Sequence, residues 1–122
     1  MSVLPKGLAV EVAARAAWSR VAEPGDRQAV ALVDRLGAVD ALAAVVEGHD
    51  WVPEALRVRA AGVDLEGLVQ FAFRRGWRMV VPGADEWPIG VDALDVPPIG
   101  LWVAGPVDLA SISARSVAVV GA

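Results

Sequence analysis

The sequence predicts an α+β or α/β protein, with a helical bundle over residues 1–76 and short strands over residues 77–122. In the first part, apolar residues recur at three- and four-residue spacing between glycines, which is typical of short amphipathic helices. In the second part, short apolar runs alternate with Pro- and Gly-rich turns, which is typical of strands and loops. We therefore predict two domains that meet after Gly76.

Five short helices are expected in the first domain, beginning with one over residues 8–21. The second helix begins at an N-cap, Asp26, and ends at Gly37. Its inward face is predicted to hold Ala29, Leu32, Val33 and Leu36. A third helix ends at Gly48, and its predicted inward face holds Val39, Leu42, Ala43 and Val46.

The last two helices of the bundle begin and end at the same kinds of residue. Pro53 lies in the first turn of a fourth helix that extends to Ala61. Asp64 caps a fifth helix, which stops at Gly76. The inward face of that helix is predicted to hold Leu65, Leu68, Val69 and Ala72.

In the second domain we expect strands over residues 77–81, 99–103 and 117–122, a helical turn over 89–94 and a short helix over 108–113. A continuously apolar last run is typical of a parallel strand covered by helices on both faces. It ends at Gly121 and Ala122, where a phosphate-binding turn begins in many α/β folds. We expect the remainder of that domain to be missing; the alternative is the last strand of a small sheet backed by the helices.

Composition excludes several classes of function. The 122 residues include no cysteine and one histidine, which rules out disulfides, cysteine zinc sites and a histidine-rich metal site, and no cofactor is expected. The net charge of −4 argues against strong DNA binding by these residues alone. No apolar run is long enough to span a membrane, so a cytoplasmic protein is expected. The neighbouring carboxylates of Asp85 and Glu86 should diverge, and we expect no enzyme.

Four motifs in the second domain resemble those of the DNA-processing protein A (DprA/Smf) family. They are the turn at 81–88, Asp92 with Leu94, the strand at 97–105 and the strand at 116–122. The segment from Trp18 to Ala44 is similar to the sterile-alpha-motif-like N-terminal domain of that family. The resemblance implies that residues 77–122 are the truncated start of an extended Rossmann-like domain.

The resemblance also implies a function. Family members bind single-stranded DNA, load the RecA recombinase on it during natural transformation, and are not enzymes. They form homodimers through the Rossmann-like domain, which lies mostly beyond this sequence. Their DNA sits in a basic pocket opened by the glycine turn.

Candidate nucleic-acid-binding residues follow from this. Gly121 and Ala122 could offer backbone N–H groups to a phosphate, and Arg74, Arg75 and Arg78 form the densest positive cluster. The plainer interpretation is that Arg74 and Arg75 complement a helix C-terminus. The five tryptophans could stack on bases, although core anchors are the more ordinary role.

Two other functions stay open. The chain could be a helical interaction module, or an inactive remnant without DNA-binding activity of its own. It could also belong to a nucleotide-binding enzyme, on the weak evidence of its final Val-Val-Gly-Ala.

Overall fold

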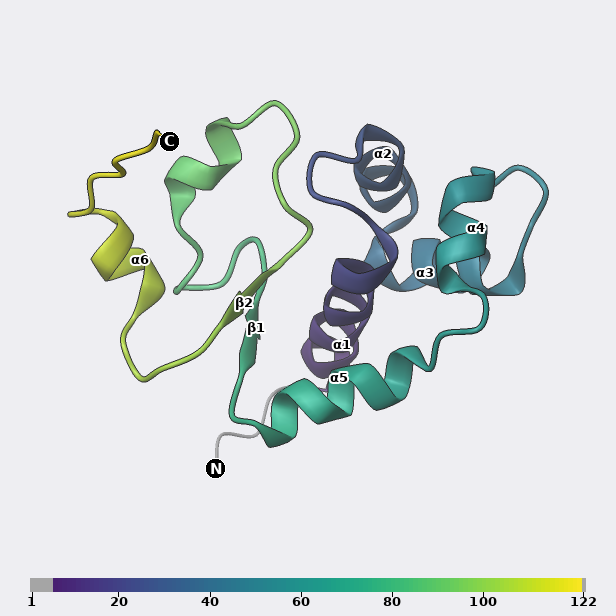
Figure 1. The fold of residues 1–122 in the computed structure, drawn as a ribbon, viewed down its shortest axis with the longest axis horizontal. Coiled ribbons are helices and arrows are strands. Elements are labelled where there is room, and N and C mark those ends of the chain that lie inside the picture. The colour runs from purple at the N-terminus through teal and green to yellow at the C-terminus, as the bar shows by residue number, and fades with distance from the viewer. Residues whose placement is uncertain (1–5, 122) are drawn as a thin grey trace.

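A computed structural model describes residues 6–121 (Figure 1). Five helices come first, then two short strands with a 3₁₀ helix between them, and a sixth helix. The elements are α1 (Lys6–Val21), α2 (Arg27–Leu36), α3 (Ala38–Glu47), α4 (Glu54–Ala60), α5 (Leu65–Arg74), β1 (Arg78–Val80), η1 (Ile89–Ala93), β2 (Leu101–Val103) and α6 (Leu109–Ser113). The α+β prediction is thereby confirmed in its coarse form.

Local signals begin α2 and α5, and end α3, at the residues that the sequence predicts. The Asp26 carboxylate accepts a hydrogen bond of 3.0 Å from the Ala29 amide and caps α2. Asp64 caps α5 in the same way through the Gly67 amide, also at 3.0 Å. Gly48 ends α3 in the left-handed conformation, with φ 76° and ψ 34°. Such a backbone strains any residue with a Cβ, so glycine is the natural stop there.

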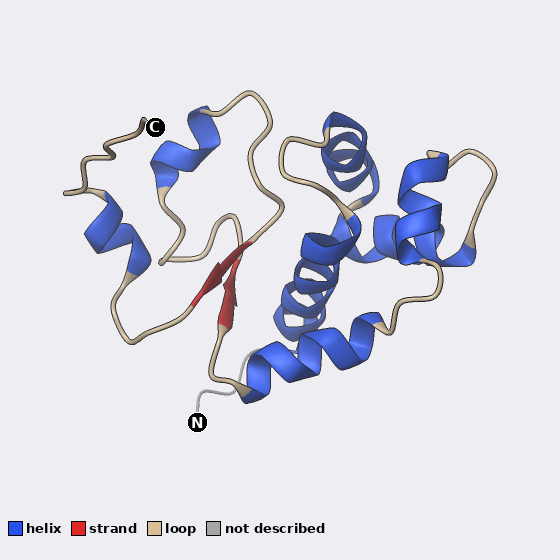
Figure 2. Ribbon diagram, viewed as in Figure 1, coloured by secondary structure: helices blue, strands red, loops and turns tan. Residues whose placement is uncertain are grey.

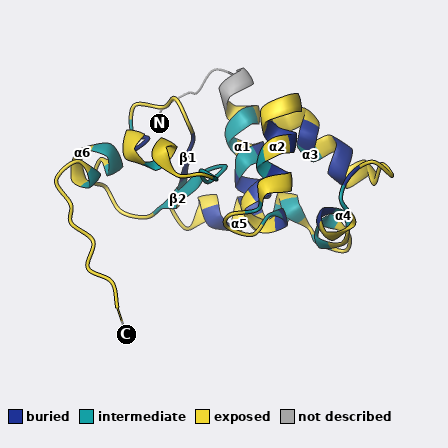
Figure 3. Cartoon of the chain, turned by 90° about the horizontal axis from the view of Figure 1, so that it is seen from above, coloured by how far each residue is buried: buried dark blue, intermediate teal, exposed yellow. Residues whose placement is uncertain are grey.

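The helical core is built around Trp18 of α1, whose side chain is fully buried. Its indole N–H donates a 2.9 Å hydrogen bond to the Ala38 carbonyl, which joins the middle of α1 to the start of α3. Figure 3 shows the buried residues on the facing sides of these helices. The cluster around Trp18 includes Val21, Ala29, Leu32, Val33, Ala38, Ala41, Val45, Val52 and Leu56.

The inward face predicted for α3 is correct only at Leu42, which is half-buried and packs against both core clusters. Val39, Ala43 and Val46 are exposed, and the buried residues of this helix are Ala38, Ala41, Ala44 and Val45. Leu36 of α2 and Leu68 of α5 were also predicted to point inward and are exposed. In α3 the small alanines face the core, on the side where the helix packs against α1 and α2.

The sheet has two antiparallel strands (Figure 2), with Arg78 opposite Val103, Met79 opposite Trp102 and Val80 opposite Leu101. The strand predicted over residues 117–122 is not formed over 117–121, and Ala122 lies outside the described residues. Val117, Val119 and Val120 are 89–93% exposed, on a tail that leaves the body of the molecule (Figure 3). A strand needs a hydrogen-bonding neighbour, and within residues 6–121 no strand pairs with the segment 117–121.

Helix α1 is shared by the helical and the strand-containing parts, and it contacts α3, α4, α5 and β1. On the β1 side, Ala16 and Ala17 pack with Val69, Met79 and Val81 in a second buried cluster. The Arg15 guanidinium donates a 2.7 Å hydrogen bond to the Ile99 carbonyl. The two parts therefore pack on opposite sides of one helix.

Candidate nucleic-acid interface

Arg78 of β1 is engaged by groups of the same chain. Its Nε donates to Glu86 Oε2 at 2.9 Å, and its Nη2 donates to Glu86 Oε1 and, at 2.8 Å, to the Val107 carbonyl. Nη1 donates to the Gly105 carbonyl. Arg78 thus connects β1 to the turn before η1 and to the loop that leads into α6.

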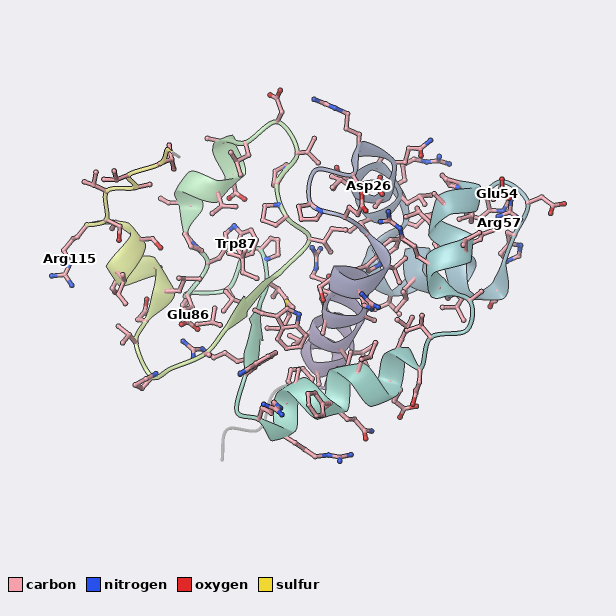
Figure 4. All side chains as sticks on the ribbon, in the orientation of Figure 1. Asp26, Glu54, Arg57, Glu86, Trp87 and Arg115 are labelled. Atoms are coloured by element: carbon pink, nitrogen blue, oxygen red, sulfur yellow. The ribbon has the colours of Figure 1, made fainter. Side chains whose placement is uncertain are left out.

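Arg78 and Glu86 each shift the pKa of the other. The hydrogen bonds from Arg78 hold the pKa of Glu86 below its ordinary value of 4.5, helped by the Leu109 amide. Glu86 in turn raises the pKa of Arg78. Figure 4 shows Glu86 between the strands and α6, close to Trp87. A phosphate that approached Arg78 would compete with a carboxylate already in bidentate contact.

Arg74 and Arg75, at the C-terminal end of α5, are exposed. Arg74 Nη2 donates to Gln70 Oε1 at 3.1 Å, one turn back along the helix. The Arg75 guanidinium lies 4.5 Å from the centre of the Phe71 ring. Neither forms an ion pair with a described carboxylate, so both guanidinium groups can meet an anion.

Gly121 is exposed, with a φ of 148°, and a Cβ built on it would meet nothing within 4 Å. The C-terminal tail lies away from α5 in both views (Figures 1 and 3). Ala122 lies outside the described residues. The structure therefore brings Arg74 and Arg75 together at the end of α5 and does not bring the glycine turn to them.

A second group of residues forms a cleft beside Arg75, and it includes Trp77 and Trp102, two of the five tryptophans that could stack on bases. The aromatic cleft lies between α1 and α5, has a volume of about 260 Å³ and is open to solvent. Its lining includes Ser19, Arg20, Leu68, Phe71, Trp77 and Trp102. These residues come from three separate segments, so no local spacing in the sequence could have identified the cleft.

The remaining tryptophans divide by role. Trp87 is buried, and its indole N–H donates a 2.9 Å hydrogen bond to Asp92 Oδ1, so the core-anchor interpretation holds for it and for Trp18. Trp51 is exposed and stacks on the His49 ring, with centroids 5.7 Å apart.

Metal and membrane features are absent from the described part of the chain. Within residues 6–121, no group of three or more His, Asp or Glu side chains could hold a metal ion. His49 instead contacts Glu47, with 2.8 Å between Nε2 and Oε2. None of the helices described has the length and apolar character to cross a bilayer.

No family model matches the chain, and no solved structure matches it. The chain is similar to two curated proteins of Mycobacterium tuberculosis, from strains CDC 1551 / Oshkosh and ATCC 25618 / H37Rv, both named "Putative DNA processing protein DprA". Each is 38% identical to it over 125 residues, a match that covers 86% of this chain and 31% of the relative. The chain thus spans less than a third of the length of these relatives. The matched part of the chain is longer than either of the two predicted domains, so it includes residues from both the helical and the strand-containing part. The match supports a DprA-like relationship.

Proposed function

We propose that this chain is part of a DNA-processing protein of the DprA type, which binds single-stranded DNA and delivers it to a recombinase. The observation that carries the proposal is the 38% identity to two DprA-named proteins across 86% of the chain. The proposal includes the finer features of the resemblance. These are a sterile-alpha-motif-like bundle, the start of a Rossmann-like domain with its homodimer surface, a cytoplasmic location, a role in natural transformation and a non-enzymatic mode of action.

The mechanism we propose is capture of phosphates without reading of the base sequence. Arg74 and Arg75 supply side-chain charge at the end of α5, and both are exposed and free of described carboxylates. Gly121 and Ala122 supply backbone N–H groups in the protein that contains the complete glycine turn. Arg78 contributes indirectly, because its hydrogen bonds to Glu86 and to the Val107 carbonyl hold β1 against the turn before η1 and the loop before α6.

The net charge of −4 sets the expected strength of binding. With 15 acidic and 11 basic residues, the average field of the chain repels DNA, so binding depends on local arginines and is weak and sensitive to salt. For single-stranded DNA, each phosphate neutralised contributes about −0.7 to the slope of log affinity against log salt.

The test is fluorescence anisotropy of a labelled single-stranded oligonucleotide, at low and at physiological salt. We expect micromolar binding that weakens with salt, and further weakening in the double variant Arg74→Gln/Arg75→Gln. The matched control is Arg35→Gln/Arg115→Gln, which also removes two exposed arginines, one in the last turn of α2 and one after α6. No binding even at low salt would refute DNA binding by this chain.

Recombinase delivery has a separate readout. We expect the chain, or the longer protein that contains it, to speed ATP hydrolysis by RecA on DNA already covered by a single-strand-binding protein. An unchanged rate alongside measurable DNA binding would contradict the recombinase part of the proposal alone.

A helical interaction module is the second candidate, favoured by an apolar groove of about 670 Å³ between α1, α3 and α5. Val10, Val39, Leu42, Val46 and Phe73 line it, with Asp64 and Glu66 beside them and no basic residue. This chemistry fits the apolar face of an amphipathic helix with basic flanks. A leucine- and lysine-based model peptide should shift the NMR signals of Val39 and Val46; unperturbed signals would contradict this candidate.

A further inference from the structure

The aromatic cleft exposes rings that a small protein ordinarily buries. Trp77 is 42% exposed and Phe71 is 53% exposed, and both line the same cleft. The floor is formed by small and aliphatic residues of α1 and α5, namely Ala16, Ala17, Leu65, Val69 and Ala72. An exposed apolar hollow of this kind is a common mark of a binding site.

The rings of the cleft are held in place. The indole N–H of Trp102 donates a 2.8 Å hydrogen bond to Ser19 Oγ, which fixes β2 against α1. Trp77 meets Trp102 edge to face, with ring centroids 6.4 Å apart, and Phe73 meets Trp102 in the same way at 5.6 Å. Trp77 is therefore a positioned ring with an accessible surface, and little freedom is lost when a flat ligand stacks on it.

The charged side chains at the cleft are positive. Arg20 lines it, and Arg75 lies over Phe71 at its edge. No carboxylate is among its lining residues, although acidic residues outnumber basic ones in the chain. Neither Arg20 nor Arg75 forms an ion pair with a described carboxylate. Aromatic rings beside free guanidinium groups fit a ligand that combines flat rings with negative charge.

We propose that the aromatic cleft binds unpaired bases of single-stranded DNA. A base stacks on Trp77 or Phe71, and Arg20 and Arg75 contact the phosphates on either side of it. The cleft, at about 260 Å³, lies below the ~300–1,000 Å³ typical of drug-sized ligands, which suits a single flat ring. This inference rests on the proposed function, since it names the surface where this chain would hold the DNA.

The experiment compares variants in anisotropy titrations with an oligothymidylate of about 12 nucleotides, within the range that one binding module covers. Trp77→Leu keeps apolar bulk and removes the aromatic face, and it should weaken binding roughly 5- to 150-fold, the equivalent of losing one stacked base. Trp77→Phe retains a ring and should restore most of the affinity. The matched control is Trp51→Leu, which removes a 55% exposed tryptophan that does not line the cleft.

An abasic oligonucleotide of the same length separates stacking from charge. It presents the same phosphates without bases, so it should bind wild type more weakly than oligothymidylate does. Trp77→Leu should lose this preference, whereas Arg20→Gln should weaken both ligands alike. An oligouridylate arm distinguishes DNA from RNA as the source of the bases; tighter binding of oligouridylate would overturn the assignment to DNA.

Two failures can be told apart. If the chain binds oligothymidylate and Trp77→Leu binds it as tightly as Trp51→Leu does, the cleft is not the stacking site, and the proposed function stands. If no oligonucleotide binds at low salt, DNA binding by this chain fails, and the cleft proposal fails with it. Circular dichroism melts of each variant confirm that a loss of binding does not reflect unfolding.

Discussion

Glu86 accepts two hydrogen bonds from the Arg78 guanidinium and a third, of 3.0 Å, from the Leu109 amide. One carboxylate thus joins β1 to the start of α6, across a chain segment that contains η1 and β2. Both partners are partly exposed, so solvent screens the pair and limits its contribution to stability. Its contribution nevertheless depends on pH in a predictable direction.

Because the pKa of Glu86 is lowered in the folded state, the pair stabilises the fold fully above the ordinary value of 4.5. That stability is lost as the pH falls through the lower, folded-state value. We expect Glu86→Gln to melt below wild type at neutral pH and to lose less of its melting temperature on acidification. The measurement is a series of thermal melts between neutral and acidic pH. Asp85→Asn, which removes an exposed neighbouring carboxylate, should keep the acid sensitivity of wild type; a steeper acid loss in Glu86→Gln would contradict the assignment.

Trp18→Phe tests the hydrogen bond at the centre of the helical core. The substitution keeps an aromatic ring but removes the N–H that donates to the Ala38 carbonyl. We expect a loss of about 1–3 kcal/mol in the free energy of unfolding for the missing hydrogen bond, and more for the space left behind. Urea titrations measure it. The exposed Trp51→Phe should stay within about 0.5 kcal/mol of wild type, and equal effects at the two positions would argue against the core role of Trp18.

Asp26→Ala tests the cap of α2. Without the carboxylate, the Ala29 amide loses its hydrogen bond at the helix start, at an expected cost of about 0.5–2 kcal/mol. Asp34→Ala, on the exposed side of the same helix, removes equal charge without a cap and should cost less. Denaturant midpoints compare the two, and the prediction fails if Asp34→Ala is the more harmful change.

Gly48→Ala and Gly90→Ala form a matched pair of backbone tests. Neither added methyl group meets an atom within 4 Å, so sterics with neighbours play no part. Gly48 has a φ of 76°, where an L residue costs about 1–2 kcal/mol, so we expect destabilisation of that size. Gly90 has no such φ, and Gly90→Ala should be neutral or stabilise by about 0.4–1 kcal/mol. Thermal melts that rank the two variants the other way would contradict this account.

The helix boundaries could be predicted because their signals are local. Asp26, Gly37 and Gly48 cap backbone groups that lie within one helical turn of them, so a short stretch of sequence contains the whole signal. The face of α3 could not be predicted, because all of its residues except Asp40 and Glu47 are apolar. A helix that is apolar nearly all round offers no periodicity to choose between its sides.

The site residues were harder to predict, because their surroundings are set by distant segments. Nothing near Arg78 in the sequence shows that the Gly105 and Val107 carbonyls will occupy its guanidinium. The aromatic cleft likewise depends on the packing of α1 against α5 and of β2 against α1. The run at 117–121 has the composition of a buried strand, but composition cannot supply the neighbours that a strand requires.

The shared position of α1 also bears on how the chain is made. Ala16 and Ala17 lie in α1, which leaves the ribosome before the strands do, yet their buried cluster is completed by Met79 and Val81. The Arg15 guanidinium likewise bonds to the Ile99 carbonyl, which is synthesised later still. The helices can pack around Trp18 early in translation, but one side of α1 stays exposed to solvent until the strands emerge from the ribosome. A ribosome stalled before β1 would therefore carry a nascent chain with an apolar stripe open to chaperones.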